Sequence, residues 1–321
     1  MNASPPSPAI APRGTQARAA LLMLASAFGF GLMALFIRLA SASAPTWEIA
    51  FFRVLFGFLI LFALLFLPMS SQPRPWQAFL ASVHTRQLPR YVVRCAIGVA
   101  AMFCGFWAIA HLPLAQAISL NYSSPIFVTV AAILMLGERV RARRWAAVIG
   151  GFIGVMVIVR PGSDAFSAGS LVAVASAMLS ALVAIQIKQL SAIDKADTIV
   201  FWTYALWVPM TLVPALWAWR MPHGIVWLWL LLAGIMGTAG QLLWTRALKL
   251  GDVSALTPIS FTQLPVVAFA GWLFFDEAID MPTIVGAGII LASAFYIAHR
   301  EAVLARRAAS KALCKSNPPV V

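Results

Sequence analysis

The stretch AALLMLASAFGFGLMALFI, residues 19–37, has no charged side chain in 19 consecutive positions. At about 1.5 Å of rise per residue, a helix of this length spans the ~30 Å hydrocarbon layer of a membrane. Arg13 and Arg18 precede the stretch, and Ala25-Ser26-Ala27 within it resembles a signal-peptide cleavage site. The run is too long for an ordinary signal core, so we interpret it as a membrane-spanning helix that is retained.

The rest of the chain is similarly apolar. Of its 321 residues, 62% are hydrophobic and 10% are charged, whereas soluble domains carry roughly 25% charged residues. A soluble fold of this length could not hide so much apolar surface from water, but a bilayer removes that need. The net charge of +13 does not indicate a nucleic-acid partner, because the basic residues lie between apolar runs instead of gathering on one face.

Ten apolar runs predict ten transmembrane helices. They cover roughly residues 19–38, 48–67, 91–110, 116–136, 145–160, 167–188, 199–219, 226–246, 254–275 and 282–299. When both chain ends are placed in the cytoplasm, most Lys and Arg residues fall on the inner side, as the positive-inside rule requires. The sequence therefore predicts an all-α, multi-pass protein of the bacterial cell inner membrane with cytoplasmic N- and C-termini.

The two halves of the chain are related. Residues 21–51 match residues 171–201 at a shift of 150, with 11 identities in 31 positions, and Arg38 corresponds to Lys188. A weaker match at a shift of 139 includes Glu138 with Glu277. The predicted organisation is a cytoplasmic tail at 1–18, a first repeat at 19–160, a second repeat at 161–300 and a basic cytoplasmic tail at 301–321.

Each repeat has five predicted spans, an odd number, so the second repeat enters the membrane from the opposite side. Two inverted copies of one unit can exchange shapes, which exposes a site at their interface first to one side of the membrane and then to the other. The predicted architecture is therefore two inverted five-helix repeats around a central cavity.

This order of features resembles the EamA-type members of the drug/metabolite transporter (DMT) superfamily. Besides the ten-span count and the duplication, the matching motifs are Glu48 with Phe51-Phe52-Arg53; Pro125 with Gly137-Glu138 and Gly150, Gly151 and Gly154; and Pro265 with Glu277, Gly286 and Gly288. The second half departs from the pattern at Asp276, where Gly is usual. The resemblance implies a basket-like helical bundle that transports amino acids, their derivatives or other small metabolites, in many cases outward.

Arg53 is the only charge well inside an apolar run. An arginine near a helix centre costs about 2.5–3.5 kcal/mol on insertion scales, so an interaction must offset that cost. We interpret Arg53 as a cation that faces the cavity and binds an anionic group of the solute. The alternatives are an ion pair with Glu48, five residues earlier, and snorkelling toward the membrane surface.

Polar clusters stand before a proline at matching places in the two halves. They are Asn121, Tyr122 and Ser124 before Pro125, and Ser260 and Gln263 before Pro265. Such clusters predict loosened helices whose side chains and freed carbonyls line a cavity and bind the solute. The alternative is ordinary interhelical packing through small polar residues.

Three further residues are candidates for an aromatic and polar wall of the cavity. Trp107, Gln241 and Trp244 lie in the third and eighth predicted spans, where indole rings could stack on a ring or a cationic solute. Tryptophan is also common at membrane interfaces, and the chain has 12 tryptophans. Both readings of these rings stay open.

Glu48, Glu138 and Glu277 are candidate gating residues. Glu138 and Glu277 end the fourth and ninth predicted spans, where the helix dipole disfavours a carboxylate. Such groups could form latches at the helix ends that bias the two states of a carrier. The alternative is that they are ordinary solvated loop charges.

Other function classes have less support. All four histidines fall in loops or at span ends, which argues against an intramembrane enzyme, and the three cysteines lack metal-ligand or disulfide spacing. We expect no metal and no cofactor. No carboxylate lies in mid-membrane, so a coupling proton cannot be assigned. A passive structural or assembly protein is a third class.

The sequence thus predicts a secondary transporter that moves a small organic metabolite, an amino acid or a derivative, across the inner membrane by alternating access. Export is the expected direction. The alternative is an uptake carrier of the same fold for a vitamin, a nucleoside-like or an S-adenosyl compound. The expected partners are the solute and the bilayer, and the oligomeric state is left open.

Overall fold

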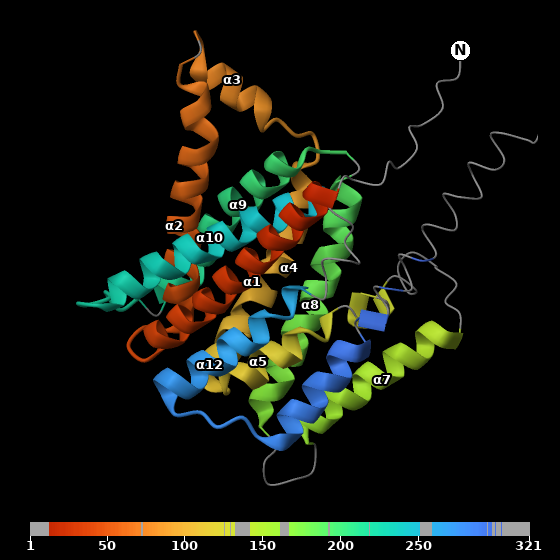
Figure 1. Cartoon of the computed structure of the whole chain (residues 1–321). Helices are drawn as coiled ribbons and strands as arrows, with labels where there is room; N and C mark the ends of the chain where they lie inside the picture. Colours follow the sequence, from red (N-terminus) through yellow and green to blue (C-terminus); the bar gives the residue numbers. More distant parts are fainter. Residues whose placement is uncertain are drawn as a thin grey trace, which may run out of the picture.

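The computed structural model describes residues 13–71, 73–124, 126–128, 130–131, 142–160, 167–191, 193–217, 219–250, 259–293, 295–296, 299 and 303. The regular structure in these residues is helical throughout (Figure 1). The long helices are α1 (Arg13–Ser41), α2 (Thr46–Phe66), α4 (Leu88–His111), α8 (Ala168–Ser191), α9 (Ala196–Trp217) and α10 (Val226–Leu250). All six contain a stretch that is long and apolar enough to cross a membrane.

Shorter helices occupy the remaining predicted spans. They are α5 (Leu114–Asn121), α7 (Ala142–Val159), α12 (Gln263–Phe275) and the helix Met281–Ser293. A 3₁₀ turn (Leu67–Met69) and α3 (Pro75–Ser82) lie between α2 and α4. The all-α, multi-pass character is thereby confirmed, whereas the count of ten crossings stays a prediction.

Large apolar side chains cover the outside of the bundle. Leu21 on α1 is 67% exposed, and Trp217 at the end of α9 is 92% exposed. Many other Leu, Ile, Phe and Met side chains on the long helices are also exposed. Such a surface is unfavourable in water and suits contact with lipid.

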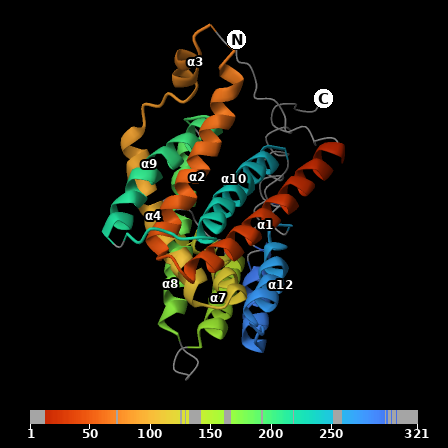
Figure 2. The same ribbon diagram turned by 90° about the vertical axis from the view of Figure 1, so that its left-hand side faces the viewer.

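The helix packing keeps its pattern when the two halves are exchanged. In the sequence match, α1 corresponds to α8 and α4 corresponds to α10. In the structure α1 lies along α10, and α8 lies along α4 (Figures 1 and 2). The counterparts α2 and α9 pack on each other, as do α5 and α12. Two related repeats that pack around a shared axis produce this set of contacts.

Two equivalent hydrogen bonds show the same exchange of the two halves at the level of single residues. The Ser26 hydroxyl donates to the carbonyl oxygen of Gly240 at 2.8 Å, and the Ser176 hydroxyl donates to that of Ala101 at 2.9 Å. Ser176 is Ser26 shifted by 150, and Gly240 is Ala101 shifted by 139. The two shifts that align the sequence therefore also exchange these two contacts.

The last helices of the two halves approach each other through glycine. A Cβ atom on Gly154 of α7 would lie 2.8 Å from the carbonyl oxygen of Gly286 and 2.9 Å from a side-chain carbon of Ile290. Only a residue without a side chain permits this approach. The glycine spacing in the fifth predicted span thus has a packing role.

Candidate functional site

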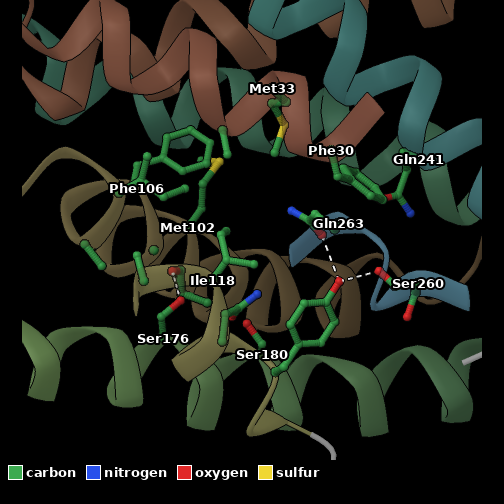
Figure 3. A pocket seen from close by; sticks show the side chains of 18 of the residues that line it. Phe30, Met33, Met102, Phe106, Ile118, Ser176, Ser180, Gln241, Ser260 and Gln263 are labelled. Atoms are coloured by element: carbon green, nitrogen blue, oxygen red, sulfur yellow. Dashed lines mark hydrogen bonds between the residues drawn. The ribbon is translucent and has the colours of Figure 1, made fainter. Parts of the chain in front are cut away.

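A cavity of about 450 Å³ lies between the two halves. It is lined from α1, α2, α4, α5, α8, α9, α10 and the start of α12. Figure 3 shows Met102 and Phe106 at one side of the cavity and Gln241, Ser260 and Gln263 at the other. The cavity thus has an apolar side and a side rich in amides and hydroxyls.

Most of the predicted binding residues line this cavity. They are Arg53, Asn121, Tyr122, Gln241, Trp244, Ser260 and Gln263. The structure therefore brings together residues from α2, α5, α10 and α12 that are far apart in the sequence. Whether they bind a solute stays a prediction.

Arg53 lies at the apolar side. It is 7% exposed, its guanidinium carbon lies 5.7 Å from the centre of the Phe106 ring, and its Nη1 lies 3.8 Å from the Met102 sulfur. A Cβ atom on Gly237 would lie 3.0 Å from Nε and Nη2 of Arg53, so the side chain rests on bare α10 backbone. No carboxylate of the described residues forms an ion pair with Arg53.

Glu48 does not pair with Arg53, so that alternative is wrong. Glu48 is fully buried, and its Oε1 accepts a hydrogen bond from the backbone N–H of Arg220 in the α9–α10 connection. Its Oε2 is buried without a hydrogen-bond partner among the residues that the structure describes. Glu48 therefore links the start of α2 in the first half to the second half, and its gating role stays a prediction.

The predicted loosened helices are present as two helix breaks that meet. α5 ends at Asn121, before a turn at 122–123, and α12 begins at Gln263, after a turn at 261–262. The Tyr122 hydroxyl lies 2.6 Å from the carbonyl oxygen of Ser260 and 3.0 Å from Oε1 of Gln263. Its single hydrogen serves one of these acceptors at a time.

The two breaks also meet through their rings. Tyr122 and Phe261 pack edge to face with ring centres 5.1 Å apart. Phe261 is Tyr122 shifted by 139, so equivalent positions of the two halves contact each other. Equivalent residues can touch only near the axis that relates the halves, which places this corner of the cavity beside that axis. Pro125 lies outside the described residues.

Two predicted binding residues do not reach the cavity. Trp107 stacks on His111 with ring centres 4.1 Å apart, and it packs against Gly169 of α8, where an added Cβ would lie 3.0 Å away. Ser124 is half-buried on the helical turn after the 122–123 break and does not belong to the lining. Both residues lie on a face of their helix that points away from the cavity.

Several lining residues were missed by the sequence analysis. They include Phe30, Met102, Phe106, Ser180 and Trp207. In a sequence, a phenylalanine, tryptophan or methionine that lines a cavity looks the same as one that packs between helices. Ser26 and Ser176 also line the cavity, and their identity across the two repeats was the one available signal.

Glu277 is the best-defined of the predicted gates, and it is not a solvated loop charge. Its Oε1 lies 3.0 Å from Nη2 of Arg38, and its Oε2 accepts a 2.8 Å hydrogen bond from the backbone N–H of Leu114. Arg38 also donates to the carbonyl oxygen of Ile109 at 2.9 Å. Glu138 lies outside the described residues.

The position of this ion pair relative to the cavity is informative. On α1 the cavity is lined by residues from Met23 to Ala34, whereas Arg38 lies one turn beyond, at the helix's C-terminal end. We call the arrangement of Arg38 and Glu277 with the α4–α5 connection the terminal latch. It joins α1, α4, α5 and the end of α12 at one end of the cavity.

Comparisons with known proteins agree with this architecture. The sequence profile of the EamA-like transporter family matches residues 17–160 and 167–298. One solved crystal structure superimposes with a TM-score of 0.57 at 18% identity, covering 85% of this chain and 96% of the other, which shows a shared fold.

Curated relatives cover most of the chain. It is 36% identical to the riboflavin transporter of Rhizobium johnstonii over 81% of this chain and 82% of that protein. It is 35% identical to the riboflavin transporter of Vibrio cholerae over 70% and 76%, and 32% identical to the pseudopaline exporter CntI of Pseudomonas aeruginosa over 84% and 92%. Family profile and relatives together establish that this chain belongs to the EamA-like transporter family.

Proposed function

We propose that this protein is a secondary transporter that carries a small organic metabolite across the bacterial inner membrane by alternating access. The observation that carries the proposal is a cavity between two related halves that holds a buried Arg53 with no carboxylate partner among the described residues. A buried, unpaired cation is costly, and a solute that brings an acceptor group offsets that cost.

The cavity favours a solute with a flat apolar body. Its volume of about 450 Å³ falls within the usual range for small-molecule sites. Phe30, Phe106 and Trp244 give its walls aromatic faces, and Arg53 is the one cation among the described lining residues. We therefore rank planar heteroaromatic compounds first, with riboflavin as the first to test because two relatives are riboflavin transporters.

An amino-acid derivative is the second candidate, which the sequence analysis had ranked first. Arg53 suits a carboxylate, and the amides and hydroxyls around Tyr122 suit an ammonium or hydroxyl group on the same solute. The similarity to the pseudopaline exporter supports the outward direction. One transport assay with both solutes, run in both directions, separates the two candidates.

The terminal latch supplies a means of alternating access. With the termini in the cytoplasm, as we propose, Arg38 and Glu277 lie on the outer side, and the latch closes the cavity there. By the two sequence shifts, Lys188 and Glu138 are their counterparts. Opening of the terminal latch then exposes the cavity to the outer side.

The test is flux into and out of vesicles reconstituted with the purified full chain. We expect saturable movement of labelled riboflavin that falls at least tenfold in Arg53→Gln and is partly kept in Arg53→Lys. Arg90→Gln, which removes an exposed cation at the start of α4, is the matched control and should leave flux unchanged. Absence of flux for both riboflavin and carboxylated amino-acid derivatives would reject the proposal.

A further inference from the structure

Trp207 on α9 holds a polar group for which the described residues provide no partner. Its indole ring contributes to the cavity lining, and its Nε1–H is buried with no hydrogen-bond acceptor in the part of the chain that the structure describes. Buried indole N–H groups normally find an acceptor, because an unmet one loses the hydrogen bonds it had in water. This group therefore requires an explanation.

The glycine against which Trp207 packs is the counterpart of the glycine against which Arg53 packs. A Cβ atom on Gly98 of α4 would lie 3.1 Å from Cζ2 and 3.3 Å from Nε1 of Trp207, so the ring rests on bare backbone. Gly237, on which Arg53 rests, is Gly98 shifted by 139. In each half, a glycine of one helix makes room for a hydrogen-bond donor from the second helix of the other half.

The two donors lie close together along α4. Trp207 contacts Gly98, and Arg53 contacts Met102, which is four residues later on the same helix face. Arg53 offers only N–H donors, and its one recorded acceptor among the described residues is the weak thioether of Met102. This side of the cavity therefore presents donors without matching acceptors.

We propose that Trp207 is a specificity-determining residue that, together with Arg53, selects solutes with an acceptor-bearing edge. The class of ligand is a planar heteroaromatic compound whose ring carbonyls or carboxylate face α4. Rotation of the indole ring away from Gly98 presents its N–H to that edge of the solute, while Arg53 binds a neighbouring oxygen of the solute. This inference rests on the proposed transport function and adds the chemical feature of the solute that the site recognises.

Two probes and two variants test the inference. The probes are riboflavin, whose tricyclic ring has two carbonyl groups on one terminal ring, and phenazine, a flat tricyclic ring whose only acceptors are two nitrogens of the central ring and whose terminal rings have none. Trp207→Phe keeps an aromatic ring and removes the N–H. Trp217→Phe is the control, because Trp217 ends the same helix and is 92% exposed. Dissociation constants are measured by calorimetry on the purified full chain in nanodiscs.

We expect Trp207→Phe to weaken riboflavin binding about tenfold, which corresponds to about 1.4 kcal/mol. Phenazine binding should stay within twofold of wild type, and Trp217→Phe should change neither constant. Equal weakening of both probes would mean that Trp207 acts only as an apolar wall, and it would overturn the inference. So would unchanged riboflavin binding, or a wild-type protein that binds neither probe.

Failure here is distinguishable from failure of the proposed function. If vesicles transport a solute at the same rate with wild type and Trp207→Phe, the inference is rejected and the transport function stands. If wild-type vesicles transport none of the tested solutes, the transport function itself is rejected, whatever the binding constants show.

Discussion

Arg38 on α1 and Glu277, two residues after the end of α12, form an ion pair 3.0 Å long although they are 239 residues apart in the chain. The remaining carboxylate oxygen of Glu277 accepts the backbone N–H of Leu114, so one side chain holds both the end of α1 and the start of α5. The Arg38 guanidinium lies 5.5 Å from the Phe275 ring centre, and both partners are mostly buried. The pair therefore resists competition from water and can stabilise one conformation of the carrier.

Loss of the Glu277 charge should open this end of the cavity. Glu277→Gln keeps an acceptor for Leu114 but removes the ion pair, so the closed arrangement loses roughly 1–3 kcal/mol. We expect a cysteine introduced at Ala34, a buried lining residue, to react several-fold faster with an impermeant maleimide applied from the Arg38 side.

The matched control for this experiment is Asp276→Asn. Asp276 is the exposed neighbouring carboxylate, and its left-handed backbone, with φ 53°, also suits asparagine. It should leave the labelling rate unchanged. Equal rates in wild type and Glu277→Gln would show that the pair does not hold the cavity closed.

The hydroxyl of Tyr122 should matter for the order of the cavity more than for folding. Tyr122→Phe keeps the edge-to-face contact with Phe261 and removes the hydrogen bonds to Ser260 and Gln263. We expect a loss of about 1 kcal/mol in thermal unfolding and a several-fold rise in the KM for transport. Tyr296→Phe, at an exposed tyrosine, is the control. A KM equal to that of wild type would contradict this role.

Sequence reasoning found Arg53 because a charge inside an apolar run is conspicuous, and it found the Tyr122 corner because polar clusters recur before prolines. It chose Trp107, which stacks on His111, and passed over Trp207, which lines the cavity. Both residues are tryptophans, so residue type alone does not tell them apart. The difference lies in helix rotation and in whether a glycine on the opposing helix leaves room, and both are tertiary properties.

The terminal latch shows a similar limit. Glu277 was a candidate gate because of its place at a helix end, but its partner Arg38 lies in the other half of the chain. Only the packing of α12 against α1 brings the two together. The repeat match gave the correspondence between helices, because equivalent helices have similar sequences. It gave no information on contacts between different helices.

Gly237 should control solute affinity through Arg53. In Gly237→Ala the new methyl group would lie 2.8 Å from the Met33 sulfur and 3.0 Å from two Arg53 nitrogens, so the guanidinium must move. Alanine also favours the helix by up to about 1 kcal/mol, so we expect intact folding with solute affinity several-fold weaker. In an Arg53→Gln background the same substitution should add little. A full additive loss would mean that Gly237 acts independently of Arg53.

Gly154 should be required for packing and not for solute recognition. An alanine methyl there would lie 2.8 Å from the Gly286 carbonyl oxygen and 3.0 Å from the Ile290 backbone nitrogen, and backbone atoms cannot turn aside as a side chain does. The helix Met281–Ser293 must therefore separate from α7, at a cost of about 1–3 kcal/mol. Gly288→Ala, on the same helix with no atom within 4 Å of the added methyl, is the matched control. Thermal unfolding of the purified chain should drop for Gly154→Ala and hold or rise for Gly288→Ala. Equal unfolding temperatures for the two variants would show that the close approach of these helices does not stabilise the bundle.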